Sequence, residues 1–209
     1  HPRSTDSGMT MKTTSDIIAD QRRSGIHPCD LEGFVSSKSR WDESAWLLDS
    51  PTRALARSGI GIDWTTVPSE LTPVFKELFW SIFISRPDGQ PYAISQAQSV
   101  FSRFRYVAKW MHEHKRKSFA SFSPALVARF VSDLKAHLRG KEKERDEDLT
   151  TASVTGYLKV LEFAFEQRTT LQARGVQGIS FPPFGEASAW SIGDEIAPEI
   201  EAFTPPIPD

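Results

Sequence analysis

The fold is decided by residues 95–117, which read SQAQSVFSRFRYVAKWMHEHKRK. Apolar side chains recur there at helical spacing and centre on Phe104, so the stretch predicts one long amphipathic helix. Along one flank of that helix, basic side chains recur at intervals of three and four residues: Arg105, Lys109, His112 and Arg116. The stretch therefore predicts a buried apolar face with a cationic stripe beside it.

A shorter helix is expected before this stretch. Pro73 follows Thr72, a residue type that caps helices, and the spacing predicts a helix over about residues 73–84, with Ser69 as an alternative cap. The segment 85–91 contains Pro-Asp-Gly, which is typical of a turn.

Two more helices are expected after the stretch. The Ser-Pro pair at 123–124 predicts a helix start, and Gly140 predicts its end. A charged loop over 141–148 follows, and the Thr pair at 150–151 caps a fourth helix that runs to about residue 173. The sequence thus predicts a mainly α fold.

Residues outside the helical region differ in composition. Residues 1–68 begin as a polar arm and then become rich in Trp, Gly and Pro, which predicts a partly flexible N-terminal extension with short extended segments. Residues 69–185 form the helical domain in this interpretation. Residues 186–209 are acidic and contain Pro, and they are expected to form a linker.

The overall composition is that of an ordinary globular protein. The 209 residues include 25 Lys and Arg, 27 Asp and Glu, and 39% hydrophobic residues, which excludes a collagen, a disulfide scaffold or a fully disordered chain. Cys29 is the single cysteine, so no intramolecular disulfide can form. The net charge of −2 gives no indication of nucleic-acid binding.

The charge is unevenly distributed along the chain. Residues 94–145 contain 12 Lys or Arg against four acidic residues, a local charge of +8. Residues 175–209 contain six acidic residues and no Lys or Arg. The near-neutral average therefore conceals a basic helical region between acidic ends, although charged residues on a solvated helix face would give a similar count.

Motifs for catalysis or metal binding are not evident. His112 and His114 would need a histidine at position 116 for the metalloprotease arrangement, and that residue is Arg116. His27 and Cys29 lack a second cysteine that would complete a zinc site. Neither a Gly-rich phosphate loop nor a Gly-x-Ser-x-Gly turn occurs. We therefore predict no catalytic residue, no metal and no cofactor.

Targeting and membrane segments are not predicted either. The apolar run 78–84 is far shorter than the roughly 20 residues that a membrane span needs. The first residues lack the apolar region of a signal peptide. We expect a cytoplasmic protein with no membrane partner.

The order of these segments resembles one known family. Four stretches carry the resemblance: SQAQSVFSRF at 95–104, FSPALVARFVSDL at 122–134, TASVTGYLKVLEFAF at 151–165 and GISFP at 178–182. Together they resemble the N-terminal core-binding domain of tyrosine recombinases, or phage integrases, which is a four-helix SAM-like bundle. The resemblance covers about residues 70–185. Gln98 and Phe181 stand where the family commonly has Thr and Asn.

The resemblance implies a DNA-binding function in site-specific recombination and DNA integration. Core-binding domains form one arm of a clamp around duplex DNA, and the full-length proteins exchange DNA strands, with tetramers assembling on the DNA. The family's chemistry lies in a separate C-terminal domain with a nucleophilic tyrosine. The His-Leu-Arg at 137–139 is one residue too short for the family's His-x-x-Arg box, so no catalytic residue is assigned here.

Ten residues are candidates for DNA contact. They comprise the cationic stripe, the outer arginines of the third helix, and the hydroxyls and lysine at the start of the fourth: Arg105, Lys109, His112, Arg116, Arg129, Arg139, Thr151, Ser153, Thr155 and Lys159.

One alternative is a helical protein-interaction module whose basic face binds an acidic partner. A helix-turn-helix regulator is excluded because the connection before the fourth helix is too long and too charged.

Overall fold

This computed structural model describes residues 33–49, 60–84, 92–145 and 150–201. The described chain is mainly helical, as the sequence predicts. The possible helix near residues 15–23, the turn at 85–91 and Cys29 lie outside the described residues. In chain order the elements are β1 (Ala45–Leu48), β2 (Ile60–Asp63), the 3₁₀-helix η2 (Trp64–Thr66), α2 (Thr72–Ile84), η3 (Ile94–Gln96), α3 (Ala97–Glu113), η4 (Phe119–Ser121), α4 (Pro124–Arg145), α5 (Thr151–Glu166), α6 (Arg168–Ala173) and α7 (Ala189–Glu201).

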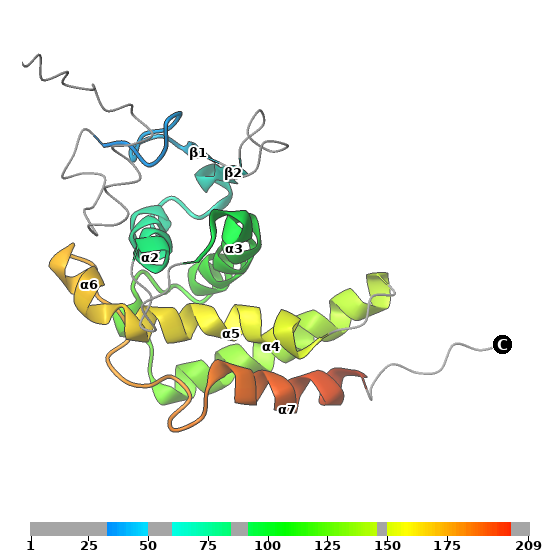
Figure 1. The fold of residues 1–209 in the computed structure, drawn as a ribbon. Helices are drawn as coiled ribbons and strands as arrows, with labels where there is room; N and C mark the ends of the chain where they lie inside the picture. The colour runs from blue at the N-terminus through cyan, green and yellow to red at the C-terminus, as the bar shows by residue number, and fades with distance from the viewer. Residues whose placement is uncertain (1–32, 50–59, 85–91, 146–149, 202–209) are drawn as a thin grey trace, which may run out of the picture.

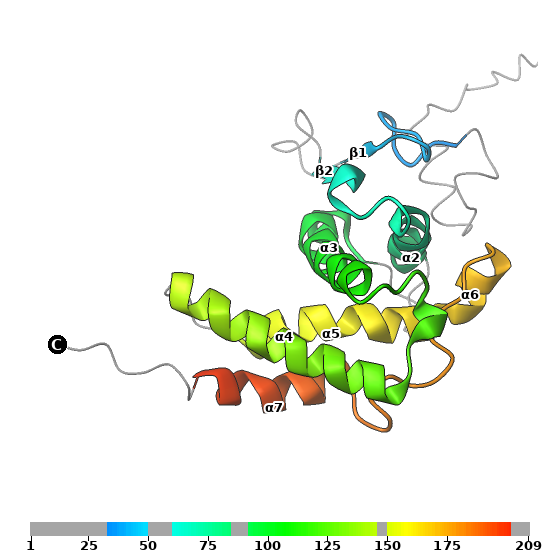
Figure 2. The same ribbon diagram turned by 180° about the vertical axis from the view of Figure 1, so that it is seen from behind.

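The helices form two layers. In Figures 1 and 2, α2 and α3 are seen nearly end-on, while α4, α5 and α7 run lengthwise beneath them. Phe75, Phe79 and Phe104 are fully buried between α2 and α3, with ring centroids of Phe79 and Phe104 5.7 Å apart. The hydrophobic core thus lies where α2 and α3 cross the lower layer.

The N-terminal extension forms a two-stranded antiparallel sheet. Trp46 pairs with Ile62 across β1 and β2, and both side chains are buried. The rings of Trp46 and Trp64 pack 4.9 Å apart, and Trp64 lies 5.6 Å from Phe79 of α2. The extended segments predicted in this region therefore belong to the hydrophobic core and are not separate from the helices.

The predicted helix caps are present in part. The Thr150 hydroxyl accepts a hydrogen bond from the Ser153 N–H at 3.2 Å, and the Ser123 hydroxyl accepts one from the Leu126 N–H at 3.2 Å. Both interactions satisfy N–H groups that the first turn of a helix leaves without a partner. The sequence therefore located the starts of α4 and α5 correctly.

Helix α4 does not end at Gly140. It continues to Arg145 through part of the predicted charged loop. Lys and Glu alternate over 141–144, and such residues have high helix propensity, which outweighs the cost of one glycine.

The predicted fourth helix is interrupted near its end, where α5 stops at Glu166 and α6 begins at Arg168. In a continuous helix the Ala164 carbonyl would accept from the Arg168 N–H. It instead accepts from the N–H of Ile179 at 3.1 Å, because the chain returns to pack against α5. A contact with a segment 15 residues away thus ends the helix.

The C-terminal segment differs most from expectation. Residues 189–201, predicted to be part of a linker, form α7, which packs along α5 and contacts α4. Ala189, Ile196 and Ala197 are buried at helical spacing, so the acidic segment carries a narrow apolar face. Acidic residues and Pro198 are typical of a linker, but here they belong to a helix with one buried side.

Candidate nucleic-acid interface

Two cations of the predicted stripe lie on the exposed flank of α3. Arg105 and Lys109 are one turn apart, and both side chains are exposed. The Lys109 ammonium lies 3.9 Å from the Glu113 carboxylate, and its side chain is 75% exposed. An ion pair this exposed contributes little free energy, so Glu113 does not prevent Lys109 from binding an external anion. Arg105 and Lys109 can therefore both bind an anion.

These two cations border a groove of about 1110 Å³, called the α3 groove here. One wall consists of the Trp64–Pro68 region and the start of α2, and the other of α3 with His137 of α4 and Tyr157 of α5. Of the described residues that line it, three are Lys or Arg, namely Lys76, Arg105 and Lys109, and one is acidic, Asp42. The α3 groove is therefore basic and rich in polar side chains.

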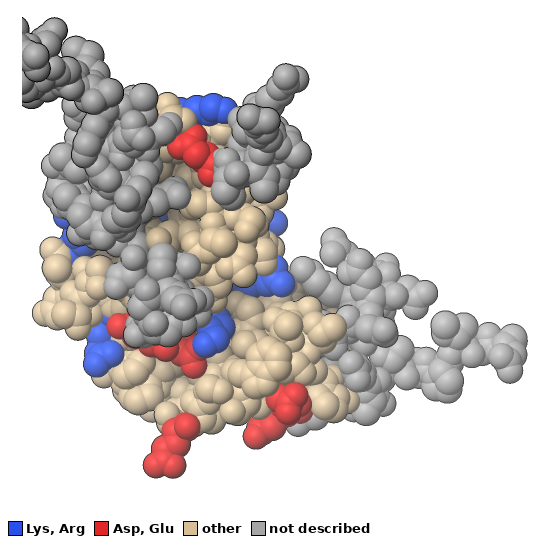
Figure 3. Space-filling model, in the orientation of Figure 1, with Lys and Arg blue, Asp and Glu red and all other residues tan. Residues whose placement is uncertain are grey.

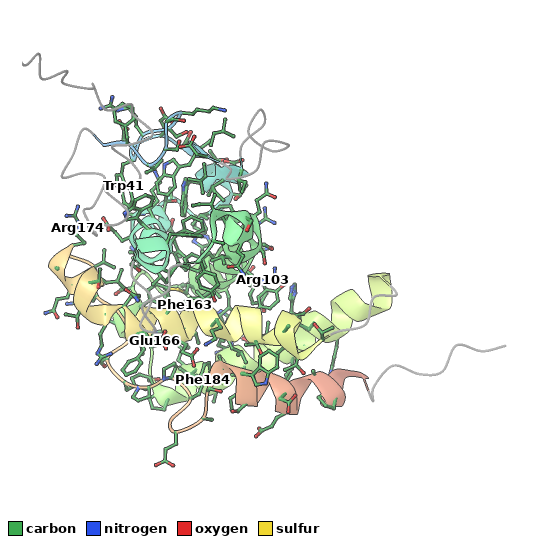
Figure 4. All side chains as sticks on the ribbon, in the orientation of Figure 1. Trp41, Arg103, Phe163, Glu166, Arg174 and Phe184 are labelled. Atoms are coloured by element: carbon green, nitrogen blue, oxygen red, sulfur yellow. The ribbon has the colours of Figure 1, made fainter. Side chains whose placement is uncertain are left out.

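Lys76 stabilises one wall of the α3 groove. Its ammonium is buried and donates hydrogen bonds to the backbone carbonyls of Trp41 and Glu43, each at 2.8 Å. The same ammonium lies 5.1 Å from the centre of the Trp46 ring, within the range of a cation–π interaction. Lys76 thereby joins the N-terminal extension to α2, and Figure 4 shows Trp41 close to that helix.

Tyr106 contributes a neutral hydroxyl to the opposite wall. Burial, together with nearby Tyr157, raises the pKa of Tyr106 well above its ordinary value, so the phenol stays protonated. Its ring packs 4.5 Å from His137 and 5.0 Å from Tyr157. The α3 groove thus combines cations with an aromatic wall that can donate a hydrogen bond.

The other half of the predicted stripe is arranged differently. His112 Nδ1 lies 2.5 Å from the Glu70 carboxylate. The backbone N–H of Glu70 and the His112 side chain hold the pKa of Glu70 below its ordinary value. Arg116 lies beyond the end of α3, which stops at Glu113 before Lys115 adopts a φ of 56°. The stripe on the helix therefore ends earlier than the sequence predicts.

The two candidate arginines of α4 do not line the α3 groove. Arg129 Nε lies 3.8 Å from the Asp133 carboxylate, which also accepts a hydrogen bond from the Trp110 indole at 2.9 Å. His114 Nε2 approaches the same carboxylate at 3.3 Å. Arg139 is half-buried farther along α4.

Helix α7 covers part of the predicted surface on α5. The Thr151 hydroxyl donates to the Asp194 carboxylate at 3.2 Å, and Thr155 is buried. A Cβ built on Gly193 would lie 2.3 Å from the Thr155 hydroxyl oxygen, so α7 packs directly on this residue. Thr155, a candidate for DNA contact, is therefore buried beneath a helix that the sequence predicted to be part of a linker.

The two remaining candidates on α5 also have partners within the chain. Ser153 joins the cap formed by Thr150, and Lys159 forms an ion pair with Glu162. The structure thus brings only Arg105 and Lys109 of the ten candidates together in the α3 groove.

Sequence reasoning missed several residues of the α3 groove: Lys76, Ser102, Tyr106, His137 and Tyr157. Tyr106 and Ser102 could have been found from their positions beside Arg105 on the same helix. The others come from elements whose placement depends on the tertiary structure.

Outside the α3 groove, basic and acidic side chains share the same surface. On the face shown in Figure 3, Lys and Arg side chains form small separate groups, and Asp and Glu side chains lie among them. Within the described ranges, no three His, Cys, Asp or Glu side chains converge to hold a metal ion. No helix among those same residues is long and apolar enough to span a membrane.

Comparisons with protein-family models, with curated proteins and with solved structures each returned no match for this chain.

Proposed function

We propose that this chain binds double-stranded DNA through the α3 groove, as the N-terminal DNA-binding portion of a site-specific tyrosine recombinase. The observation that carries the proposal is the placement of Arg105 and Lys109 on successive turns at the edge of a groove whose described lining includes one acidic residue, Asp42. Cations arranged in this way neutralise phosphates and release counterions. They give affinity that depends strongly on salt and weakly on sequence.

The neutral groups of the α3 groove support the same ligand. Ser102 and Tyr106 carry hydroxyls that line it, and hydroxyls are frequent partners of DNA phosphates. The Tyr106 phenol is protonated at neutral pH even at its ordinary pKa of 10.0, so it offers a hydrogen-bond donor to the ligand. A polyanion therefore meets hydrogen-bond donors and cations along residues 102–109 of α3.

The assignment to recombinases rests on the order of the helices. Helices α2, α3, α4 and α5 follow each other as expected from the resemblance to a SAM-like core-binding domain. In this proposal the strand-exchange chemistry and the assembly of tetramers on DNA belong to the full-length recombinase. Translation of the reading frame beyond Asp209 tests this part, since Arg, Lys, His-x-x-Arg and Tyr boxes are expected there.

DNA binding is tested by fluorescence anisotropy of a labelled duplex at increasing salt. Arg105→Gln and Lys109→Gln should each weaken binding to all sequences alike and reduce the salt slope by about 0.9. Arg168→Gln is the matched control, because Arg168 is an exposed cation on α6 that lies outside the α3 groove. The control should leave the slope unchanged.

Absence of salt-dependent binding to any duplex would overturn the proposal. The basic face could in that case serve a helical protein-interaction module, the alternative function. Binding of polyglutamate that is weakened by Arg105→Gln, together with no duplex binding, would favour that alternative.

A further inference from the structure

A second hollow lies where α3 crosses α5, and it differs from the α3 groove. It has a volume of about 140 Å³ and is called the Arg103 hollow here. Its polar lining consists of Arg103, Lys159, Gln96, Ser99 and Tyr92, and no Asp or Glu lines it among the described residues. Figure 4 shows Arg103 at this junction between the two helices. Among the described residues, the hollow is therefore lined by two cations and by no carboxylate.

Arg103 is held in place by three contacts. Its Nη1 donates to the Ser99 carbonyl at 3.2 Å, and its guanidinium carbon lies 5.3 Å from the centre of the Tyr157 ring. The side chain also lies against Gly156, where an added Cβ would be 3.0 Å from Nε. A glycine inside a helix lowers helix stability, and here it provides the space for Arg103. The guanidinium is thus positioned before any ligand arrives.

The charge of Arg103 is not neutralised within the described chain. None of the described carboxylates lies within ion-pair distance of its guanidinium, and its contacts are a carbonyl and an aromatic ring. Lys159 is partly neutralised by Glu162, whose other carboxylate oxygen accepts from the Ala189 N–H at 3.1 Å. Nη1 is the guanidinium nitrogen of Arg103 that donates a hydrogen bond among the described residues, so the other N–H groups remain available to a ligand.

We propose that the Arg103 hollow is a receptor for a single phosphate group. The planar guanidinium can donate two parallel hydrogen bonds to phosphate oxygens, and Lys159 adds a second positive charge. Gln96 and Ser99 are exposed at the rim and carry neutral donors that suit the remaining oxygens. A volume of about 140 Å³ accommodates one such group but no extended ligand.

The phosphate group has two possible sources, a nucleic-acid backbone or a free phosphate or phosphomonoester. The receptor does not depend on duplex binding through the α3 groove, because the two sites share no lining residue. Loss of one function therefore leaves the other measurable.

NMR titration of the intact chain with inorganic phosphate tests the receptor, with acetate at equal ionic strength as the carboxylate comparison. Phosphate should shift the Arg103 Nε–H resonance and the amide resonances of Ser99 and Gly156, and acetate should shift them less. Arg103→Gln should abolish the phosphate-dependent shifts of the Ser99 and Gly156 amide resonances. Arg168→Gln is the matched control, because Arg168 also donates to a carbonyl, that of Phe165 at 2.8 Å, and lies 4.2 Å from an aromatic ring.

Gly156→Ala is the second variant. It keeps every charge and raises helix propensity, yet its methyl group occupies the space of the Arg103 side chain. We expect weaker phosphate binding, by at least threefold, with no loss of thermal stability. If Arg103 had only a structural role, Gly156→Ala would not weaken phosphate binding while leaving thermal stability unchanged.

Duplex binding by the Arg103→Gln variant, measured at increasing salt, identifies the source of the phosphate. If Arg103→Gln reduces the salt slope of duplex binding by about 0.9, the phosphate belongs to nucleic acid. If phosphate binds and the slope is unchanged, the hollow takes a free phosphate. The inference is wrong if phosphate causes no shift in the wild-type chain and Arg103→Gln leaves duplex binding unchanged. This outcome does not depend on whether Arg105 and Lys109 mediate DNA binding.

Discussion

At the scale of single residues, position on α3 decides what each cation can do. Arg105 points into the α3 groove, Arg103 lies on Gly156, and His112 is engaged by Glu70. The sequence predicted Arg105 and His112 as equal members of one stripe. They differ because Glu70, from the segment before α2, binds His112, whereas Arg105 borders the α3 groove.

The pKa of Asp63 is lowered by hydrogen bonds from a residue two positions along the chain. Its carboxylate accepts hydrogen bonds from the Thr65 hydroxyl at 2.6 Å and the Thr65 N–H at 3.0 Å, and these hold its pKa below the ordinary value of 3.8. Because the folded-state pKa is lowered, the ionised carboxylate stabilises the fold above about pH 4. That contribution is lost as the pH falls through the lowered pKa.

Thr65→Val should raise the pKa of Asp63 toward 3.8, because it removes the donor with the largest effect. An NMR titration of the Asp63 carboxyl carbon measures the change. Thr66→Val is the control, since the Thr66 hydroxyl donates to the Asp63 backbone carbonyl and not to the carboxylate. Equal pKa values in wild type and Thr65→Val would contradict this assignment.

At the scale of elements, α7 is the main addition to what the sequence predicted. It is held by close backbone packing at Gly193 and by the Glu162 carboxylate, which accepts from the Ala189 N–H at the start of the helix. The burial of Thr155 follows from this packing. An acidic composition alone therefore did not distinguish a linker from an amphipathic helix.

Gly193→Ala should destabilise the chain by roughly 1–3 kcal/mol, the cost of overpacking, although alanine has the higher helix propensity. The added Cβ would lie 2.3 Å from the Thr155 hydroxyl oxygen and 3.3 Å from the Thr151 carbonyl. Urea unfolding measures the loss. Gly156→Ala is the matched control, because the atoms nearest to its Cβ are side-chain atoms of Arg103 at 3.0 Å or more.

The double variant Gly193→Ala with Thr155→Ala should recover part of the loss. The Thr155 hydroxyl is buried with no hydrogen-bond partner in the described chain, so Thr155→Ala alone should be nearly neutral. Strict additivity of the two substitutions would contradict the direct contact.

At the scale of the whole molecule, the N-terminal extension and α7 are parts of one core with the four predicted helices. Trp46 and Trp64 of the extension pack against Phe79 at centroid distances of 6.4 and 5.6 Å. Removal of either outer part would expose large apolar surfaces to water.

A fragment of residues 70–185, which contains the four predicted helices, should therefore lack a cooperative thermal transition. A fragment of residues 33–201 should show one, because it retains β1, β2 and α7. Near-UV circular dichroism during heating distinguishes the two fragments. A sharp transition of the shorter fragment would show that the four helices fold without their neighbours.

The helices α2 to α5 and the starts of α4 and α5 could be predicted from the sequence, because apolar periodicity and capping residues are local properties. The same periodicity located Arg105 and Lys109 on an exposed helix flank. The folded structure was needed to show that α7 covers Thr155, that Lys76 joins the extension to α2, and that Arg103 lies on Gly156. These features depend on contacts between segments distant in the chain, whose geometry arises when the core is packed.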